Sequence, residues 1–209
     1  MAAASHDLVA NMPPVASLTL WAMEQAQDND EDLMLRYQAG DAAAFDRLYA
    51  RHRGGLFRFI LRQCKARSHA EELFQDVWMN LIQARERYRV EAQFRTWLYT
   101  LAHNRLIDYY RSAGRPDAVL FDSDENLPEP AASRVEEPHV QAAAREQGAE
   151  ILRLVEALPA PQREAFLLHE EGGLSVEEIA AATGVSFEAA KSRLRYAVAK
   201  LREGLKEFV

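Results

Sequence analysis

The chain has 209 residues, 48% of them hydrophobic, which is ordinary for a folded protein and too high for a fully disordered one. Its net charge of −7 is unfavourable for a protein that binds DNA alone, because neutralised phosphates supply most non-specific affinity. The single cysteine, Cys64, excludes an intrachain disulfide and fits a reducing cytoplasm, and without a run of about 18 apolar residues we expect no membrane-inserted segment.

Residues 1–28 are interpreted as a mobile N-terminal tail. Their apolar patch, 15–23, has no Lys or Arg before it, which argues against a signal peptide. Residues 29–113 then carry several helical patterns and no convincing strand pattern. Asp41 is suited to cap the first long helix, which Gly54-Gly55 weakens locally.

The next helix is predicted to begin at Ser68, where Glu71 would complete a capping box. Apolar residues recur from Leu73 to Ile82 at a spacing that builds one broad buried face. Five residues follow the opposite, polar side of this helix: Glu72, Gln75, Asp76, Met79 and Asn80.

A loop at 86–93 and a further helix ending near Arg111 combine aromatic and basic side chains. Aromatic residues at helical spacing usually belong to a core. Opening DNA, however, needs aromatic faces that hold unstacked bases and cations that hold the displaced backbone. The residues alone leave both interpretations open.

Residues 114–144 are predicted to be a flexible acidic linker. Four prolines, and seven acidic residues against one arginine between 117 and 137, disfavour a packed core. Residues 145–209 form a second helical domain, in which Pro159 stops one helix and Pro161 opens the next.

Residues 175–203 carry the most specific local pattern, that of a helix-turn-helix. Ser175 and Glu178 form a capping box, Gly184 provides the turn, and Ser186 caps a long helix. An apolar stripe from Ala190 to Phe208 faces inward and leaves basic residues outside it. A solvated basic helix in an ordinary bundle is the alternative, but caps, turn and spacing agree on the first interpretation.

Three segments resemble conserved regions of bacterial sigma factors, the RNA polymerase subunits that recognise and open promoter DNA. Residues 159–203 resemble region four, residues 71–88 the core-binding helix of region two, and residues 94–112 the part that melts the promoter. With no third domain between them, the order resembles the extracytoplasmic-function (ECF) group. The implied fold is all-α, with a region 2 bundle at 29–113 and region 4 at 145–209.

The resemblance implies a role for each surface. Binding to the core polymerase is assigned to Glu72, Gln75, Asp76, Met79 and Asn80. Recognition and melting of the −10 element are assigned to Arg89, Gln93, Arg95, Trp97, Tyr99, Asn104 and Arg105. Reading of the −35 element is assigned to Ser186, Phe187, Glu188, Ala189, Lys191, Ser192, Arg193 and Arg195.

It also implies the partners: core RNA polymerase, through the clamp of its largest subunit and through its flap, promoter DNA, and an inhibitory anti-sigma factor. No cofactor, metal or catalytic residue is implied. The chain departs from the common Gly-Thr-Val pattern at Glu188-Ala189-Ala190. A carboxylate there could accept a hydrogen bond from cytosine, so we predict a shifted −35 preference.

Two other classes of protein are alternatives. An autonomous dimeric helix-turn-helix regulator would read a palindrome without polymerase, but no dedicated dimerisation helix is evident. His169-Glu170 begins like a zinc-protease motif, yet Gly173 occupies the place of the second histidine, and no phosphate loop or nucleophile elbow is present. The sequence therefore predicts no enzyme.

Two basic segments flank the acidic linker. Residues 47–67 hold seven basic residues and no acid, and residues 188–206 hold six against two. Because the linker offsets their charge, we expect the free chain to bind DNA weakly and a partner to complete the binding surface.

Overall fold

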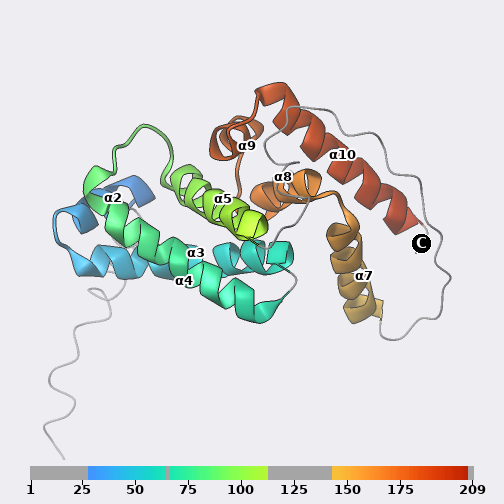
Figure 1. Ribbon diagram of the computed structural model, residues 1–209, viewed down its shortest axis with the longest axis horizontal. Helices are drawn as coiled ribbons and strands as arrows, with labels where there is room; N and C mark the ends of the chain where they lie inside the picture. The colour runs from blue at the N-terminus through green and yellow to red at the C-terminus, as the bar shows by residue number, and fades with distance from the viewer. Residues whose placement is uncertain (1–27, 65, 113–142, 207–209) are drawn as a thin grey trace, which may run out of the picture.

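The computed structural model describes residues 28–64, 66–112 and 143–206, with side chains from residue 148 in the last range. These ranges form eight α-helices and one 3-10 helix, and no strand within them, which confirms the all-α prediction (Figure 1). The expected tail apart from Asp28, residues 114–142 of the expected linker, and Phe208 lie outside the described residues.

The N-terminal half is a bundle of four α-helices. They are α2 (Asp30–Gln38), α3 (Ala42–Cys64), α4 (Arg67–Ala84) and α5 (Phe94–Ser112), with the 3-10 helix η1 (Arg85–Arg87) after α4. Helices α2, α4 and α5 all pack on α3, the longest of them. The predicted weak point at the paired glycines does not interrupt α3, because packing on both sides supports its backbone.

Side chains cap the helices of this half. The Asp41 carboxylate accepts the N–H groups of Ala43 (3.0 Å) and Ala44 (3.4 Å), which confirms the predicted cap of α3. Glu31 of α2 accepts the N–H of Phe94 at 2.6 Å and so caps the start of α5 from another helix. No local pattern indicates that second cap, because its two partners are far apart in the sequence.

The predicted capping box of α4 is wrong. The helix begins at Arg67, with Ala66 at the cap position and no side-chain cap. Ser68 therefore lies inside the first turn. Glu71 accepts from Arg67 at 2.8 Å, so its carboxylate is engaged by an (i, i+4) ion pair instead of the backbone.

The C-terminal half consists of α7 (Ala143–Ala157), α8 (Ala160–Glu170), α9 (Val176–Thr183) and α10 (Phe187–Lys206). Pro159 stands between α7 and α8, and Pro161 lies in the first turn of α8, as predicted. On α7 the apolar side chains are only partly covered, since Val155 is buried but Ile151 and Leu152 are exposed.

The helix-turn-helix forms as predicted. Both hydrogen bonds of the Ser175–Glu178 capping box are present at the start of α9. Gly184 follows α9 with φ +69°, a left-handed conformation that glycine adopts without steric cost. The Ser186 hydroxyl accepts the N–H of Ala189 at 3.3 Å and caps α10, whose inner side buries Ala190, Ala197 and Leu201.

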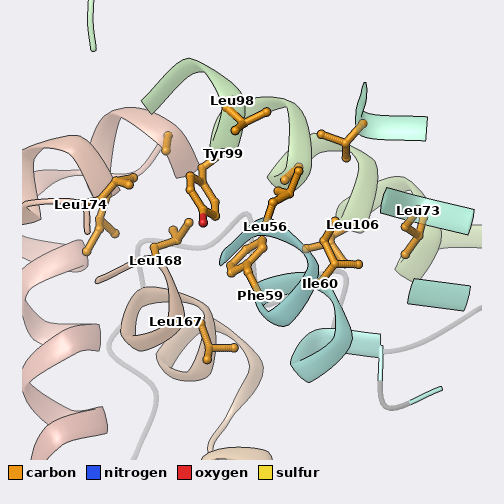
Figure 2. Packing of buried hydrophobic residues seen from close by; sticks show 14 of the residues in the cluster. Leu56, Phe59, Ile60, Leu73, Leu98, Tyr99, Leu106, Leu167, Leu168 and Leu174 are labelled. Carbon is orange, nitrogen blue, oxygen red and sulfur yellow. The ribbon is translucent and has the colours of Figure 1, made fainter. Parts of the chain in front are cut away.

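The two halves pack against each other in the middle of the molecule, where α3 and α5 meet α8 and α9 (Figure 1). Tyr99 of α5 lies between the halves, with Leu168 and Leu174 on one side and Leu56 on the other (Figure 2). Its ring also meets the edge of the Phe59 ring, with centroids 5.3 Å apart. The buried apolar side chains of the two halves consequently form one continuous cluster.

Removing the α9 cap should destabilise the protein, whereas removing the misplaced α4 cap should not. Ser175→Ala deletes an acceptor for a backbone N–H, so we expect a loss of about 1 kcal/mol in the free energy of unfolding. Ser68→Ala is the matched control, with an expected change close to zero. Urea denaturation measures both, and equal losses would contradict the assignment of the caps.

Candidate nucleic-acid interface

The polar side of α4 forms one exposed strip. Glu72, Gln75, Met79 and Asn80 are all exposed, and Asp76 is partly exposed among them. Their spacing of three and four residues brings them to one helix face. Met79 keeps 51% of its surface accessible, which is unusual for a methionine and leaves an apolar contact in the middle of the polar strip.

Asp76 joins this strip to α5. Its carboxylate accepts Nε of Arg105 at 2.8 Å and also lies 2.8 Å from Nη2. A residue predicted to bind polymerase is thus paired with one predicted to bind DNA. Sequence reasoning treated the two surfaces as separate, because the residues are on different helices.

The loop after α4 is held from outside by Gln38. Its side-chain amide donates to the carbonyl oxygens of Arg85 (2.9 Å) and Glu86 (3.0 Å), which fixes the end of α4. Arg89 donates to the carbonyl oxygen of Tyr88 at 2.8 Å but remains exposed. Gln93 at the end of the loop is exposed as well, so two predicted −10 residues face solvent here.

Three other predicted −10 residues of α5 point in different directions. Asn104 is exposed, whereas Trp97 is partly buried against Tyr88, with ring centroids 4.8 Å apart. Tyr99 is buried between the halves and donates its hydroxyl to the backbone oxygen of Glu171 at 3.1 Å. Burial, and after it the Glu171 carboxylate, raises the pKa of Tyr99 above its ordinary value, so the hydroxyl remains a donor at neutral pH.

Arg95, the remaining predicted −10 residue, faces the C-terminal half. Its Nε lies 3.9 Å from a carboxylate oxygen of Glu178, and the hydroxyl of the neighbouring Thr96 donates to the same oxygen at 3.2 Å. Tyr99 is therefore not on an open surface with Arg89 and Gln93, whereas Arg95 keeps part of its side chain exposed.

Several polar residues between the halves were missed by sequence reasoning. His103 is buried and lies 2.7 Å from Glu164, and Arg163 donates to the side-chain oxygen of Gln63 at 3.1 Å. Charged residues this deeply buried are paired as a rule, but the partners are about 60 and 100 residues apart in the sequence. Only their positions on otherwise apolar helix faces could have indicated them.

The first basic segment is largely neutralised by acidic side chains. Burial raises the pKa of Asp30, but the hydrogen bonds and charges of His52 and Arg51 together outweigh it and hold the pKa below its ordinary value. Most arginines of this segment form ion pairs: Arg47 with Asp28, Arg51 with Asp30, Arg58 and Arg62 with Glu171, and Arg67 with Glu71. Carboxylates therefore offset part of the positive charge that was counted along this segment, among the arginines that the structure describes.

The start of α10 presents the residues predicted to read DNA. Ser186, Phe187, Glu188, Lys191 and Arg195 are exposed, while Ala189, Ser192 and Arg193 are half-buried. The side chains also contact one another.

Lys191 lies 3.5 Å from the Glu188 carboxylate and 5.5 Å from the Phe187 ring centre. Arg195 lies over the ring of Tyr196, an exposed aromatic residue that sequence reasoning missed. The surface therefore combines cations with two accessible aromatic rings.

Other kinds of site are absent or incomplete in the described part of the chain. It holds no group of three or more His, Cys, Asp or Glu side chains placed to bind a metal. His169, from the protease-like pattern, lies 2.9 Å from the carbonyl oxygen of Leu174. No helix within these residues combines the length and apolarity that crossing a membrane requires.

Two family models match the chain. Residues 48–116 match Sigma-70 region 2, and residues 148–201 match Sigma-70, region 4. The first match covers α4, the loop and α5, and the second covers the helix-turn-helix. The residues predicted to bind the −10 element and those predicted to read the −35 element thus all lie within matched segments.

Curated relatives match along most of their length. The RNA polymerase sigma factor CarQ of Myxococcus xanthus is 33% identical over 174 residues, which cover 83% of this chain and 96% of CarQ. The ECF RNA polymerase sigma-E factor of Escherichia coli K12 is 27% identical over 172 residues, covering 80% and 90%.

Two solved structures share the fold. CnrH, in complex with the cytosolic domain of CnrY, is 25% identical, with a TM-score of 0.62 over 86% of this chain and 99% of CnrH. The sigma factor RpoE of Bartonella quintana, in complex with the anti-sigma factor NepR, is 26% identical, with a TM-score of 0.58 over 78% and 96%.

The Asp76–Arg105 pair should contribute little to stability. Because both side chains are partly exposed, solvent screens their attraction, and we expect a coupling below about 1 kcal/mol. A double-mutant cycle with Asp76→Asn and Arg105→Gln, followed by urea denaturation, measures it. A coupling of several kcal/mol would instead make the pair a structural element of the bundle.

Proposed function

This chain belongs to the sigma-70 family of RNA polymerase sigma factors, in the extracytoplasmic-function group, and we propose how its surfaces divide the work of initiation. As a member, it binds core RNA polymerase and directs promoter recognition, melting and transcription initiation. The observation that carries this conclusion is the match of both halves, in order, along 96% of CarQ.

The exposed strip of α4 is proposed to bind the clamp of the largest polymerase subunit. Glu72 and Asp76 supply negative charge, Gln75 and Asn80 supply hydrogen bonds, and Met79 supplies an adaptable apolar contact. An exposed methionine surrounded by polar side chains is typical of the centre of a separable interface, which supports this assignment.

The loop at 88–93 and α5 are proposed to capture the −10 element. Arg89 and Gln93 are accessible for the first contacts, and Asn104 extends the surface along α5. Trp97 and Tyr99 offer aromatic faces for unstacked bases, and Arg95 and Arg105 offer charge for the backbone. The C-terminal half covers the Tyr99 ring in this structure, whereas part of the Arg95 side chain stays exposed.

The start of α10 is proposed to enter the major groove at the −35 element. Lys191, Arg193 and Arg195 serve phosphates or guanine, and Ser186 lies at the helix N-terminus, whose dipole favours a phosphate. The Phe187 ring and the Ala189 methyl group can contact a thymine methyl group, and the Ser192 hydroxyl can bond with any base.

We further propose that the chain acts in the cytoplasm as an initiation factor without catalysis of its own, under control of an anti-sigma factor. The sigma factor RpoE of Bartonella quintana was solved in complex with the anti-sigma factor NepR, and CnrH in complex with the cytosolic domain of CnrY, which supports such a partner. An autonomous dimeric regulator is less well supported, because the N-terminal half then has no role.

In-vitro transcription with purified core polymerase and genomic DNA fragments tests the function. We expect transcripts from a small set of start sites only when the chain is present. Tight binding to a palindromic duplex without polymerase, together with no transcripts, would favour the autonomous regulator.

Asp76→Asn should weaken binding to core polymerase by about 2 kcal/mol, roughly thirtyfold, because it removes a charge-assisted contact. Surface plasmon resonance with immobilised core enzyme measures the dissociation constant. Asp46→Asn, which removes an exposed carboxylate from α3, is the control and should bind like the parent chain. Equal affinities of the two variants would refute the role of the α4 strip.

Glu188→Gln should change which −35 sequences are selected from random DNA by the reconstituted holoenzyme. Replacing the acceptor carboxylate with an amide alters the preference for cytosine by about 1–2 kcal/mol at the contacted position. Glu203→Gln, near the other end of α10, is the control and should leave selection unchanged. Identical sequence profiles for both variants would exclude a role of Glu188 in specificity.

A further inference from the structure

An exposed tyrosine lies on α10 just beyond the residues assigned to the −35 element. Tyr196 keeps 37% of its surface accessible, and its ring is outside the buried apolar cluster. The inner side of α10 buries Ala190, Ala197 and Leu201 instead. Since Tyr196 follows Ser192 by four residues, the two side chains share one side of the helix. The packing of α10 therefore does not depend on the tyrosine ring.

The ring of Tyr196 holds a neighbouring cation. The guanidinium carbon of Arg195 lies 5.0 Å from the centre of the ring, a distance at which the ring attracts a positive charge. Arg195 itself is exposed. The contact restricts the guanidinium without neutralising it, because the ring carries no net charge.

Arg195 differs in this respect from other cations of the molecule. Lys191, one turn earlier, lies 3.5 Å from the Glu188 carboxylate, and Arg47 and Arg51 also have acidic partners. Among the residues that the structure describes, Arg195 forms no ion pair with a carboxylate. Its charge consequently remains available for a phosphate, and the gain from releasing counterions is kept.

The position of Tyr196 along α10 fits the rim of a major groove. An α-helix rises about 1.5 Å per residue, so Tyr196 is about 12 Å further along the axis than Glu188. The major groove is also about 12 Å wide. A helix whose first residues meet the bases therefore reaches the phosphates at the groove edge near Tyr196. Ala199, three residues further on, is exposed and small, which leaves space for a DNA strand beside the ring.

We propose that Tyr196 positions Arg195 and that the two side chains together hold one DNA strand at the rim of the −35 major groove. The ring keeps the guanidinium against a phosphate, and the tyrosine hydroxyl donates a hydrogen bond to a backbone oxygen nearby. The inference rests on the proposed role of α10 and adds a residue to it. Contacts to phosphates fix affinity and register but carry no direct sequence information. Tyr196 thus supports the grip on the promoter, whereas Glu188 is proposed to affect which bases are preferred.

Tyr196→Phe tests the hydroxyl contact and keeps the ring. With holoenzyme reconstituted from core polymerase and the full-length chain, its affinity for a labelled promoter duplex should fall about tenfold, because a hydrogen bond to a charged group is lost. Fluorescence anisotropy at low temperature, before the strands separate, measures this affinity. Tyr37→Phe, which removes a hydroxyl from half-buried Tyr37 of α2, is the matched control and should bind like the parent.

Tyr196→Leu tests the positioning of Arg195, because it removes the ring as well. Leucine is a good helix former, so circular dichroism should show an unchanged helix content. Affinity should fall about thirtyfold, and the slope of log affinity against log salt should decrease by about one, as for Arg195→Gln. Tyr196→Phe should keep the parent slope. Adding Tyr196→Leu to Arg195→Gln should cost only about tenfold, since no guanidinium is left to position.

Selection from random DNA separates a backbone contact from base reading. The holoenzyme with Tyr196→Phe should select the same −35 sequences as the parent, and a changed profile would overturn the backbone contact. Parent-like affinity of Tyr196→Phe, or a parent-like salt slope of Tyr196→Leu, would also overturn the proposal, provided that the parent chain supports transcription. Failure of the parent chain to support transcription with core polymerase would instead overturn the proposed function.

Discussion

The approach of α8 to α3 and α5 determines how the rest of the molecule is arranged. It requires a residue without a side chain at Gly55, and it places the backbone oxygen of Glu171 where the Tyr99 hydroxyl donates to it. Leucines of both halves then close around the Tyr99 ring (Figure 2). Because apolar burial and a specific hydrogen bond act at the same point, the halves have one preferred docking geometry, and α9 and α10 are carried along with α8.

Local signals were sufficient for most of the helices. Asp41, the Ser175–Glu178 pair and Gly184 act on neighbouring backbone groups, so their effects could be predicted from spacing alone. Ser68 has the same spacing to Glu71, but α4 begins one residue earlier and Arg67 binds the carboxylate. The cap of α5 by Glu31 and the support of the loop by Gln38 depend on the packed fold, which spacing does not describe.

The candidate interface was predictable where a surface lies on one helix. The α4 strip and the start of α10 follow helical periodicity, and the structure exposes most of their predicted residues. The α5 residues were harder, because periodicity identifies faces of a helix but not what covers each face. Trp97 packs on Tyr88 of the preceding loop, whereas Tyr99 packs on the C-terminal half. In the sequence both are aromatic residues close to arginines, so their different surroundings could not be predicted.

Contacts between side chains also determine how much of the counted positive charge is accessible. Counting residues suggested two basic surfaces, yet Arg47, Arg51 and Arg58 already have carboxylate partners within 2.8 Å. Each paired arginine releases few counterions on meeting a phosphate, since its charge is already compensated. A net charge of −7 is therefore consistent with a chain that binds DNA only weakly by itself. It leaves the exposed cations at the start of α10, and the polymerase on which the chain is proposed to dock, as sources of free energy for holding promoter DNA.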